Sequence, residues 1–317
     1  LRDKLQRMIV ILSDTANSQI YTSEYEVISR YIDLAVSLPW DKRTEDNLNI
    51  DKARDVLEKH HYGMEKVKER ILEYIAVLNL TEEERGRRME RATGPLASTK
   101  ATVLCFVGLP GIGKTSVAYS IAEALERKFI RVAMGGVGSS VHLRGRSRAF
   151  PQADPGQIIK GLARAQSKNP VILLDEIDRI SDEAHTEVMG VLLELLDPEQ
   201  NTEFQDHYLD YPFDLSEVLF ICTANHKRNI ANAVLDRLEV IEMPAYTDDE
   251  KKVIGKDYLL PRVMKECGIE KEQLKIEKDL WPQILRPLGY DAGIRTLERT
   301  IRGICRKAAV KIVQSDA

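Results

Sequence analysis

The sequence has no long apolar run, little net charge and no internal repeat, and each of these absences excludes a class of protein. No apolar stretch approaches the roughly 20 residues that a membrane-spanning helix needs, and nothing at the start resembles a signal peptide. A net charge of −4 over 317 residues excludes generic nucleic-acid binding by the whole surface, although a local basic patch stays open. We expect a globular chain long enough for about two domains, with no membrane partner.

Cysteines are few, and their positions exclude two further kinds of site. The four cysteines lie far apart and form no C-x-x-C pair, which argues against a metal centre or a disulfide framework. Cys105 and Cys222 fall in apolar runs predicted to be strands, where a thiol acts as a small buried hydrophobe. Few, unpaired and buried cysteines favour a protein of a reducing compartment.

The N-terminal part of the chain has a helical pattern interrupted by polar connections. Residues 1–36 carry apolar residues at helical spacing, and 37–51 reads as a linker. Two helices joined near 60–63 are expected over 51–80. The charged segment 81–100 is expected to be a solvated, mobile connection.

From residue 102 to 243, apolar strand-like runs alternate with helical patterns. Strands are expected at 102–107, 129–134, 171–175, 218–223 and 239–243, with helices at 114–128 and near 155–168, 183–196 and 229–236. This alternation predicts an α/β fold with a five-stranded parallel sheet covered by helices. Beyond Pro244 only helices are expected. We therefore divide the chain into a helical segment and linker (1–50), an α/β subdomain (51–244) and a small all-α subdomain (245–317).

The most specific motif is 108-GLPGIGKT-115, which follows a predicted strand and opens a predicted helix. Its spacing, G-x-x-x-x-G-K-[ST], suits a phosphate, because glycines let backbone N–H groups turn inward around an anion. The lysine can reach the β- and γ-phosphates, and the threonine can bind Mg²⁺. The candidate nucleotide-binding residues are Gly108, Leu109, Pro110, Gly111, Ile112, Gly113, Lys114 and Thr115.

Two more strand ends carry polar residues that suit the same chemistry. In 171-VILLDEID-178, Asp175 can hold Mg²⁺ through water and Glu176 can polarise a water for attack on the γ-phosphate. The run 218-VLFICTAN-225 ends in Thr223 and Asn225, which could hydrogen-bond that water or the phosphate. The second signal is weak by itself, since asparagine after a strand is usually turn chemistry.

Taken in order, these motifs resemble an AAA+ ATPase, and longer strings resemble one family within it, the Lon proteases. The general resemblance rests on 108-GLPGIGKT-115, 172-ILLDEID-178, 222-CTAN-225, 236-DRLE-239 and 293-GIRTLER-299. The family resemblance rests on 61-HYGMEKVKERILEYIAV-77, 192-LLELLDPEQN-201, 206-DHYLD-210 and 214-DLSEVLFICTAN-225. It covers roughly residues 25–313. It implies an AAA+ P-loop NTPase fold, with a five-stranded αβ subdomain and a small helical lid, usually assembled as a hexameric ring.

The resemblance also implies roles for single residues. Asn225 would be the sensor at the strand end, Arg237 an arginine finger acting on the neighbouring subunit's nucleotide, and Arg295 a second sensor carried by the lid. His61, Tyr62 and Gly63 resemble the segment that borders the adenine. Simpler interpretations stay open: the two arginines could be surface ion-pair partners, and His61 and Tyr62 could pack at a helix start.

Four features depart from the Lon pattern. Segment 142-HLRGRSRAFPQADPGQ-157 aligns with a substrate-gripping pore loop, but its aromatic, Phe150, is followed by Pro151 and Gln152. Segment 181–190 lacks the usual pattern, and 81–100 is longer than is habitual. The Ser–Lys proteolytic domain of Lon proteins would begin about where the chain ends, and a chain starting at Leu1 is expected to be a fragment or a processed product.

The resemblance implies an unfoldase that uses ATP and Mg²⁺, returns ADP, and draws unfolded or damaged polypeptide through a ring pore, in the cytoplasm or the mitochondrial matrix. One alternative is an AAA+ protein acting on nucleic acid, which the basic run 144-RGRSR-148 keeps open. Another is a degenerate module that binds nucleotide and translocates nothing. For Phe150, burial in the domain core is the simpler alternative to a place in the pore.

Overall fold

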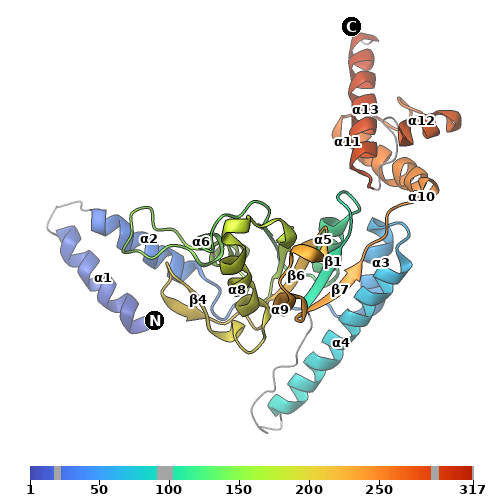
Figure 1. Ribbon diagram of the computed structural model, residues 1–317. Helices are drawn as coiled ribbons and strands as arrows, with labels where there is room; N and C mark the ends of the chain where they lie inside the picture. The colour runs from blue at the N-terminus through green and yellow to red at the C-terminus, as the bar shows by residue number, and fades with distance from the viewer. Residues whose placement is uncertain (18–22, 91–102, 287–292, 316–317) are drawn as a thin grey trace.

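The computed structural model describes residues 1–17, 23–90, 103–286 and 293–315. The N-terminal helices lie at one end of the molecule, the sheet lies in the middle, and the C-terminal helices lie at the other end (Figure 1). The chain termini are therefore far apart in Figure 1. Within the described ranges, no helix is long and apolar enough to cross a membrane.

The central sheet has five strands, all parallel, in the order β2-β3-β6-β1-β7. Its strands are β1 (Val103–Val107), β2 (Phe129–Ala133), β3 (Val171–Asp175), β6 (Leu219–Ala224) and β7 (Leu238–Glu242). The inner strands β1, β3 and β6 are buried at every position, as expected when helices cover both faces of a parallel sheet. The predicted α/β fold is confirmed, with strand bounds within a residue or two of those expected.

The helices of the αβ region and the N-terminal segment follow the predicted order. They are α1 (Arg2–Asn17), α2 (Ser23–Ser37), α3 (Ile50–His60), α4 (Glu65–Glu90), α5 (Lys114–Ala124), α6 (Val141–Arg144), α7 (Gln157–Ala165), α8 (His185–Leu196) and α9 (Asn232–Leu235). Helix α5 ends four residues before the predicted limit of 128, since Glu126 takes a left-handed conformation with φ of 57°. Such a residue cannot continue an α-helix.

Two features of the sequence analysis need correction. Segment 81–100 is not a connection throughout, because α4 continues to Glu90; its residues 81–90 lack proline and consist largely of strong helix formers. Residues 91–100 lie outside the described part of the chain. A short antiparallel hairpin, β4 (Phe204–Asp206) with β5 (Tyr211–Phe213), was not expected. Strands of three residues are too short to show the alternation by which strands are recognised.

After the sheet, the described residues form helices, as predicted beyond Pro244. These are α10 (Asp248–Val253), the π-helix η5 (Ile254–Leu259), α11 (Leu260–Glu266), α12 (Trp281–Leu285) and α13 (Arg295–Ser315). Trp281 is buried at their centre, so close to Gly255 that a Cβ there would lie 2.7 Å from the indole.

Candidate functional site

The phosphate-loop motif forms the turn between β1 and α5, as its sequence context required. Gly111 and Gly113 have φ of 83° and 98°, a region that residues with a Cβ avoid. Gly108 is constrained by space, because a Cβ there would lie 2.7 Å from the carbonyl oxygen of Met243. Since α5 begins at Lys114, its first N–H groups face the loop. The turn therefore has the backbone of an anion-binding cradle.

Lys114 is folded back into this turn and is only 7% exposed. Its Nζ donates to the carbonyl oxygens of Gly108 and Leu109, and to Asn225 Oδ1 at 2.9 Å. Burial lowers its pKa from the ordinary value, while nearby carboxylates, led by Asp178, act in the opposite direction. A buried cation that is held by neutral carbonyl oxygens suits an anionic ligand, which would stabilise its charge.

Asp175 ends β3 at the same edge of the sheet as the phosphate loop, and is 4% exposed. Its Oδ1 accepts hydrogen bonds from Thr223 Oγ1 at 2.5 Å and Thr115 Oγ1 at 3.4 Å. The threonine and aspartate assigned to Mg²⁺ are therefore brought together from the start of α5 and the end of β3, which are 60 residues apart in the chain. Hydroxyl and carboxylate oxygens are hard donors of the kind that Mg²⁺ prefers, so the donor set fits this ion.

Arg131 of β2 also contacts Asp175, and the sequence analysis did not single it out. Its Nε and Nη2 lie 2.7 Å and 2.6 Å from Asp175 Oδ2. The signal was present, since arginine is unusual inside an otherwise apolar strand. Thr223, expected with Asn225 to hydrogen-bond the attacking water or the phosphate, is instead fully buried. Its hydroxyl donates to Asp175 and accepts a hydrogen bond from the Glu176 backbone N–H at 2.9 Å.

Glu176 follows Asp175 and has φ of 61°, an uncommon conformation for a residue with a side chain. The conformation turns its carboxylate over Gly135, where a Cβ would lie 2.9 Å from Oε2. Arg179 Nη1 lies 3.6 Å from the same oxygen. Backbone strain of this kind concentrates at functional sites, where the surrounding structure holds it in place.

Asn225 lies directly after β6, next to the phosphate loop. Its Oδ1 accepts from Lys114, whereas its Nδ2 is buried and has no hydrogen-bond partner among the described residues. A buried amide donor costs free energy unless it finds an acceptor. This orphan donor beside Lys114 is consistent with a ligand that supplies oxygen atoms.

The C-terminal helices reach the phosphate loop at the start of α13. Ile294 N–H donates to Gly111 O at 3.0 Å, and a Cβ at Gly111 would lie 3.0 Å from Arg295 Cγ. Tyr246, which precedes α10, donates its hydroxyl to Ile112 O at 3.2 Å. The structure therefore brings Arg295 to the loop over 180 residues of sequence, as its proposed role requires.

The segment His61–Gly63 connects α3 to α4 on the outer side of α5. His61 is 7% exposed and its Nε2 lies 2.9 Å from Ser120 Oγ. Burial, and then the nearby charges of His60 and Lys68, lower the His61 pKa to about 4. Tyr62 is 38% exposed, and its ring centroid lies 6.4 Å from that of Tyr258. The His61 imidazole thus packs against α5, and the partly exposed Tyr62 ring meets Tyr258 of the C-terminal helices.

Among the described residues, no contact joins the Arg237 side chain to the residues around Lys114. It precedes β7 and makes an ion pair with Asp197, with Nη2 3.0 Å from Oδ2. Asp197 is held by the Glu199 backbone N–H, the main cause of its lowered pKa. The Arg237 side chain stays 47% exposed, so it is a surface ion-pair partner that a second molecule could reach.

Phe150 lies in the turn between α6 and α7 and is 62% exposed. Burial in the domain core, the simpler alternative for this residue, is therefore wrong. Gln152, two residues on, has φ of 58°. A residue exposed to this extent contributes little to the core of the αβ region.

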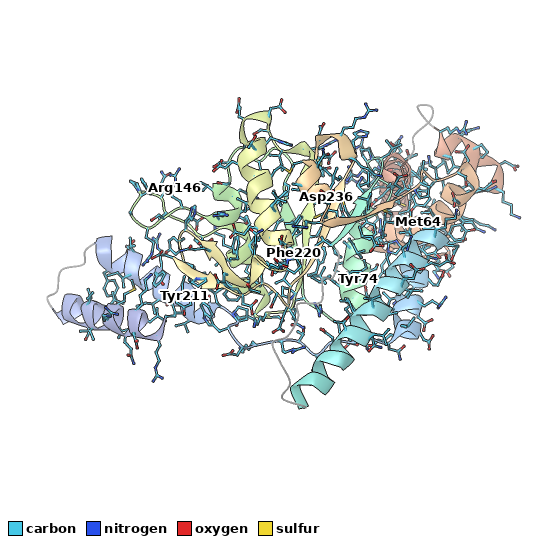
Figure 2. All side chains as sticks on the ribbon, turned by 60° about the horizontal axis from the view of Figure 1, so that its bottom comes forward. Met64, Tyr74, Arg146, Tyr211, Phe220 and Asp236 are labelled. Carbon is cyan, nitrogen blue, oxygen red and sulfur yellow. The ribbon has the colours of Figure 1, made fainter. Side chains whose placement is uncertain are left out.

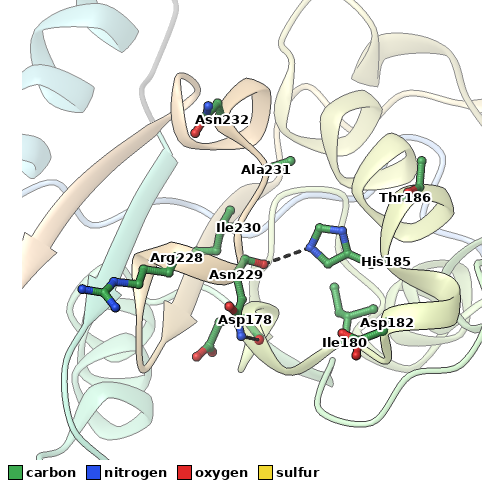
Figure 3. A pocket seen from close by; sticks show the side chains of 10 residues that line it. All are labelled: Asp178, Ile180, Asp182, His185, Thr186, Arg228, Asn229, Ile230, Ala231 and Asn232. Carbon is green, nitrogen blue, oxygen red and sulfur yellow. Dashed lines mark hydrogen bonds between the residues drawn. The ribbon is translucent and has the colours of Figure 1, made fainter.

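A pocket of about 560 Å³ lies beside this constellation rather than within it (Figure 3). It is lined by Asp178, Ile180, Asp182, His185, Thr186, Arg228, Asn229, Ile230, Ala231 and Asn232. Figure 3 shows His185 pointing to the Asn229 carbonyl oxygen, with which its Nε2 makes a 3.0 Å contact. Within the described ranges no group of three or more His, Cys, Asp or Glu residues is arranged to hold a metal ion, so the polar lining does not make this pocket a metal centre.

Comparisons with known proteins match two parts of the chain to family models and most of it to curated relatives. Residues 104–245 match the ATPase family associated with various cellular activities (AAA), and 265–317 match the Lon protease AAA+ ATPase lid domain. The chain is 50% identical over 293 residues to Lon protease 2 of Thermus thermophilus, covering 92% of this chain and 36% of the relative. It is 47% identical over 293 residues to Lon protease of Heliobacterium modesticaldum (92% and 34%) and 46% identical over 291 residues to that of Clostridioides difficile (92% and 35%). The chain thus spans about a third of the length of these relatives.

Proposed function

The chain belongs to the Lon protease family, through its AAA+ ATPase module, and on that premise we propose that it binds and hydrolyses ATP at the carboxyl ends of β1, β3 and β6. The observation that carries this proposal is the meeting of Lys114, Asp175 and Asn225 at one edge of the sheet, next to a glycine cradle. Phosphate binding at such a strand end and helix start follows from the orientation of the backbone N–H groups.

Each side chain then has a role that its surroundings support. Lys114 pairs with the phosphates, and Thr115 and Asp175 hold Mg²⁺, which neutralises phosphate charge when bound. Glu176 takes the proton of the attacking water, oriented by Asn225. Arg295 contacts the same nucleotide from the lid, and Arg237 reaches the nucleotide of a neighbouring subunit in a hexameric ring. His61, Tyr62 and Gly63 border the adenine.

Nucleotide binding is tested with Lys114→Ala, measured by titration with a fluorescent ATP analogue. The matched control is Lys128→Ala, which removes the same charge from an exposed position after the same helix. We expect Lys114→Ala to lose binding and hydrolysis, and Lys128→Ala to keep both. Equal affinities in the two variants would refute the phosphate assignment.

We further propose that hydrolysis moves unfolded polypeptide past Phe150, which would line the channel of the ring. Its exposed ring supports this role, because apolar contact can grip a chain without sequence preference. Phe150→Ala should abolish the stimulation of ATPase by casein and leave basal ATPase intact, whereas Phe150→Tyr should retain most of the stimulation. Undiminished stimulation in Phe150→Ala would refute the gripping role.

The alternative of a nucleic-acid partner loses support from the contacts of the basic run 144–148. Arg144 pairs with Glu194, and Arg148 is engaged by Tyr31 and Asp210. Two of its three arginines are therefore partly neutralised within the chain. Comparing stimulation of ATPase by single-stranded DNA and by casein decides between the two substrates; stimulation by neither would favour a module that binds nucleotide without translocation.

A further inference from the structure

The turn that carries Phe150 is closed at its base. We call residues 146–154 the Phe150 loop. Arg146 N–H donates to Asp154 O at 2.9 Å, which closes the loop across its neck. Just outside the neck, a Cβ at Gly145 would lie 2.7 Å from both Asp154 O and Gly156 N. The two ends of the loop are therefore fixed to one another.

The neck rests on the connection between β4 and β5. Asp206, which is fully buried, accepts the Gly156 N–H at 2.7 Å through Oδ2 and the Tyr208 and Leu209 N–H groups through Oδ1. His207 N–H donates to Arg144 O at 2.7 Å. The unexpected β4–β5 hairpin thus supports the base of the Phe150 loop, and we call this hairpin the platform.

The N-terminal helices contact the same platform and the loop together. Tyr31 of α2 is fully buried, and its hydroxyl donates to Leu209 O at 3.1 Å. The Arg148 guanidinium lies 3.9 Å from the centroid of the Tyr31 ring. This separation is well within the range for a cation–π contact, which strengthens as the pair is desolvated. Arg148 is two residues from Phe150, so the contact acts close to the loop tip.

Charges complete the junction. Asp210 Oδ2 lies 2.8 Å from Lys4 Nζ of α1 and 3.8 Å from Arg148 Nη2. Lys4 Nζ also donates to Asp210 O at 3.2 Å. A single carboxylate therefore ties the first helix of the chain to the arginine of the Phe150 loop. In Figure 1 the N-terminal helices and the segment around α6 lie on the same side of the molecule, and Figure 2 shows Arg146 on that side too, away from Met64.

We infer that Tyr31 and Asp210 are positioning residues for the Phe150 loop: they hold Arg148, and through it the N-terminal helices set where Phe150 stands. One consequence of this inference rests on the proposed function: if Phe150 grips a polypeptide, the strength of that grip depends on α1 and α2. Its structural part, the restraint on the loop, is independent of what Phe150 contacts.

The test is hydrogen exchange of residues 147–153, followed by mass spectrometry in the full chain, beside casein-stimulated ATPase. Arg148→Met removes the cation and keeps an unbranched side chain. Arg146→Met is the matched control, because it removes the same charge from the same loop and keeps the backbone bond to Asp154. We expect exchange to rise roughly three- to tenfold in Arg148→Met and to stay unchanged in Arg146→Met, given the usual strength of a cation–π contact.

Two Tyr31 variants separate the ring from the hydroxyl. Tyr31→Phe keeps the ring over Arg148 and should leave loop exchange near the wild-type rate. Tyr31→Leu removes the ring and should raise loop exchange as Arg148→Met does; if it fails to fold, Asp210→Asn provides the second measurement, with a smaller rise. Unchanged loop exchange in Arg148→Met would overturn the inference.

The ATPase readout distinguishes this inference from the proposed function. Faster loop exchange together with reduced stimulation by casein supports both. Faster exchange with full stimulation supports the restraint by Tyr31 and Asp210 and overturns the gripping role of Phe150. Basal ATPase should be unchanged in every variant, because Arg148 and Tyr31 lie outside the nucleotide site.

Discussion

The nucleotide site and the Phe150 loop lie in one αβ region but are built in different ways. Asp175 and Asn225 stand at the ends of buried strands, and Lys114 begins α5. Hydrogen bonds join Lys114 to Asn225, and Asp175 to the hydroxyls of Thr115 and Thr223. Phe150 stands on a turn that is fixed at its neck and through Arg148, with its ring in solvent. A rigid site and an exposed side chain on a loop suit different tasks. Charge stabilisation needs groups that are already oriented, whereas grip on a moving chain needs a side chain that can travel with its loop.

The largest expected effect concerns Arg237, which belongs to neither region within a single chain. Among the described residues its side chain pairs with Asp197 and not with Lys114, Asp175 or Asn225, so the proposed role is one on a neighbouring subunit. Arg237→Ala should retain ATP binding and lose roughly 10³–10⁵ in turnover, the usual worth of an arginine finger. Steady-state ATPase measures the loss.

Mixing experiments sharpen that prediction. Arg237→Ala subunits combined with Lys114→Ala subunits should recover part of the activity, because some interfaces then pair an intact pocket with an intact finger. If Arg237 serves only its ion pair with Asp197, the substitution should cost well under about 1 kcal/mol of stability and leave turnover near the wild-type level.

The second prediction concerns Glu176 in the preorganised network. Glu176→Gln keeps the shape and removes the base, so hydrolysis should fall by about 10²–10⁴ while ATP still binds. Glu183→Gln, an exposed acid a few residues away, is the control and should behave as wild type. Single-turnover ATPase with parallel binding measurements makes the comparison. Wild-type turnover in Glu176→Gln would show that another group accepts the proton.

The third prediction compares two phenylalanines, one from each region. Phe106 of β1 is fully buried, and Phe150 is 62% exposed. Phe106→Ala should lower the free energy of unfolding by about 3–5 kcal/mol. Phe150→Ala should change it by no more than about 0.5 kcal/mol. Denaturant unfolding measures both, and a large loss in Phe150→Ala would mean that its ring packs in solution and cannot line a channel.

The smallest expected effect is a pH dependence beside the nucleotide site. His61 has a pKa of about 4 in the folded chain, below the ordinary histidine value of 6.5, so the unfolded chain binds the proton more tightly. Its contribution to stability is fully present above pH 6.5 and is lost as pH falls towards 4, by up to about 3 kcal/mol. The free energy of unfolding should therefore fall less steeply between pH 6.5 and 4 in His61→Gln. Parallel curves for the two proteins would contradict the burial of a neutral imidazole.

Much of the fold could be predicted from the sequence, because its signals are local. Strands such as Val171–Asp175 are unbroken apolar runs, and α5 follows a turn rich in glycine. The errors arose where local signals were misleading or weak. The charged residues 81–90 suggested a solvated connection but have high helix propensity, and strands of three residues show no period.

In the site, the sequence by itself determined which chemistry is available. The motif 108–115 and the pair Asp175–Glu176 specify phosphate and metal chemistry through residue type and spacing alone. The tertiary structure decided which side chains meet. Arg131 binds Asp175 because β2 and β3 are neighbours in the sheet, and Ile294 reaches Gly111 because the lid folds back over the loop. Contacts such as Tyr31 with Arg148 join residues more than 100 positions apart, and they depend on the packing of whole elements. Residue spacing along the chain does not predict that packing, because the packing arises only when the buried faces of separate elements come together.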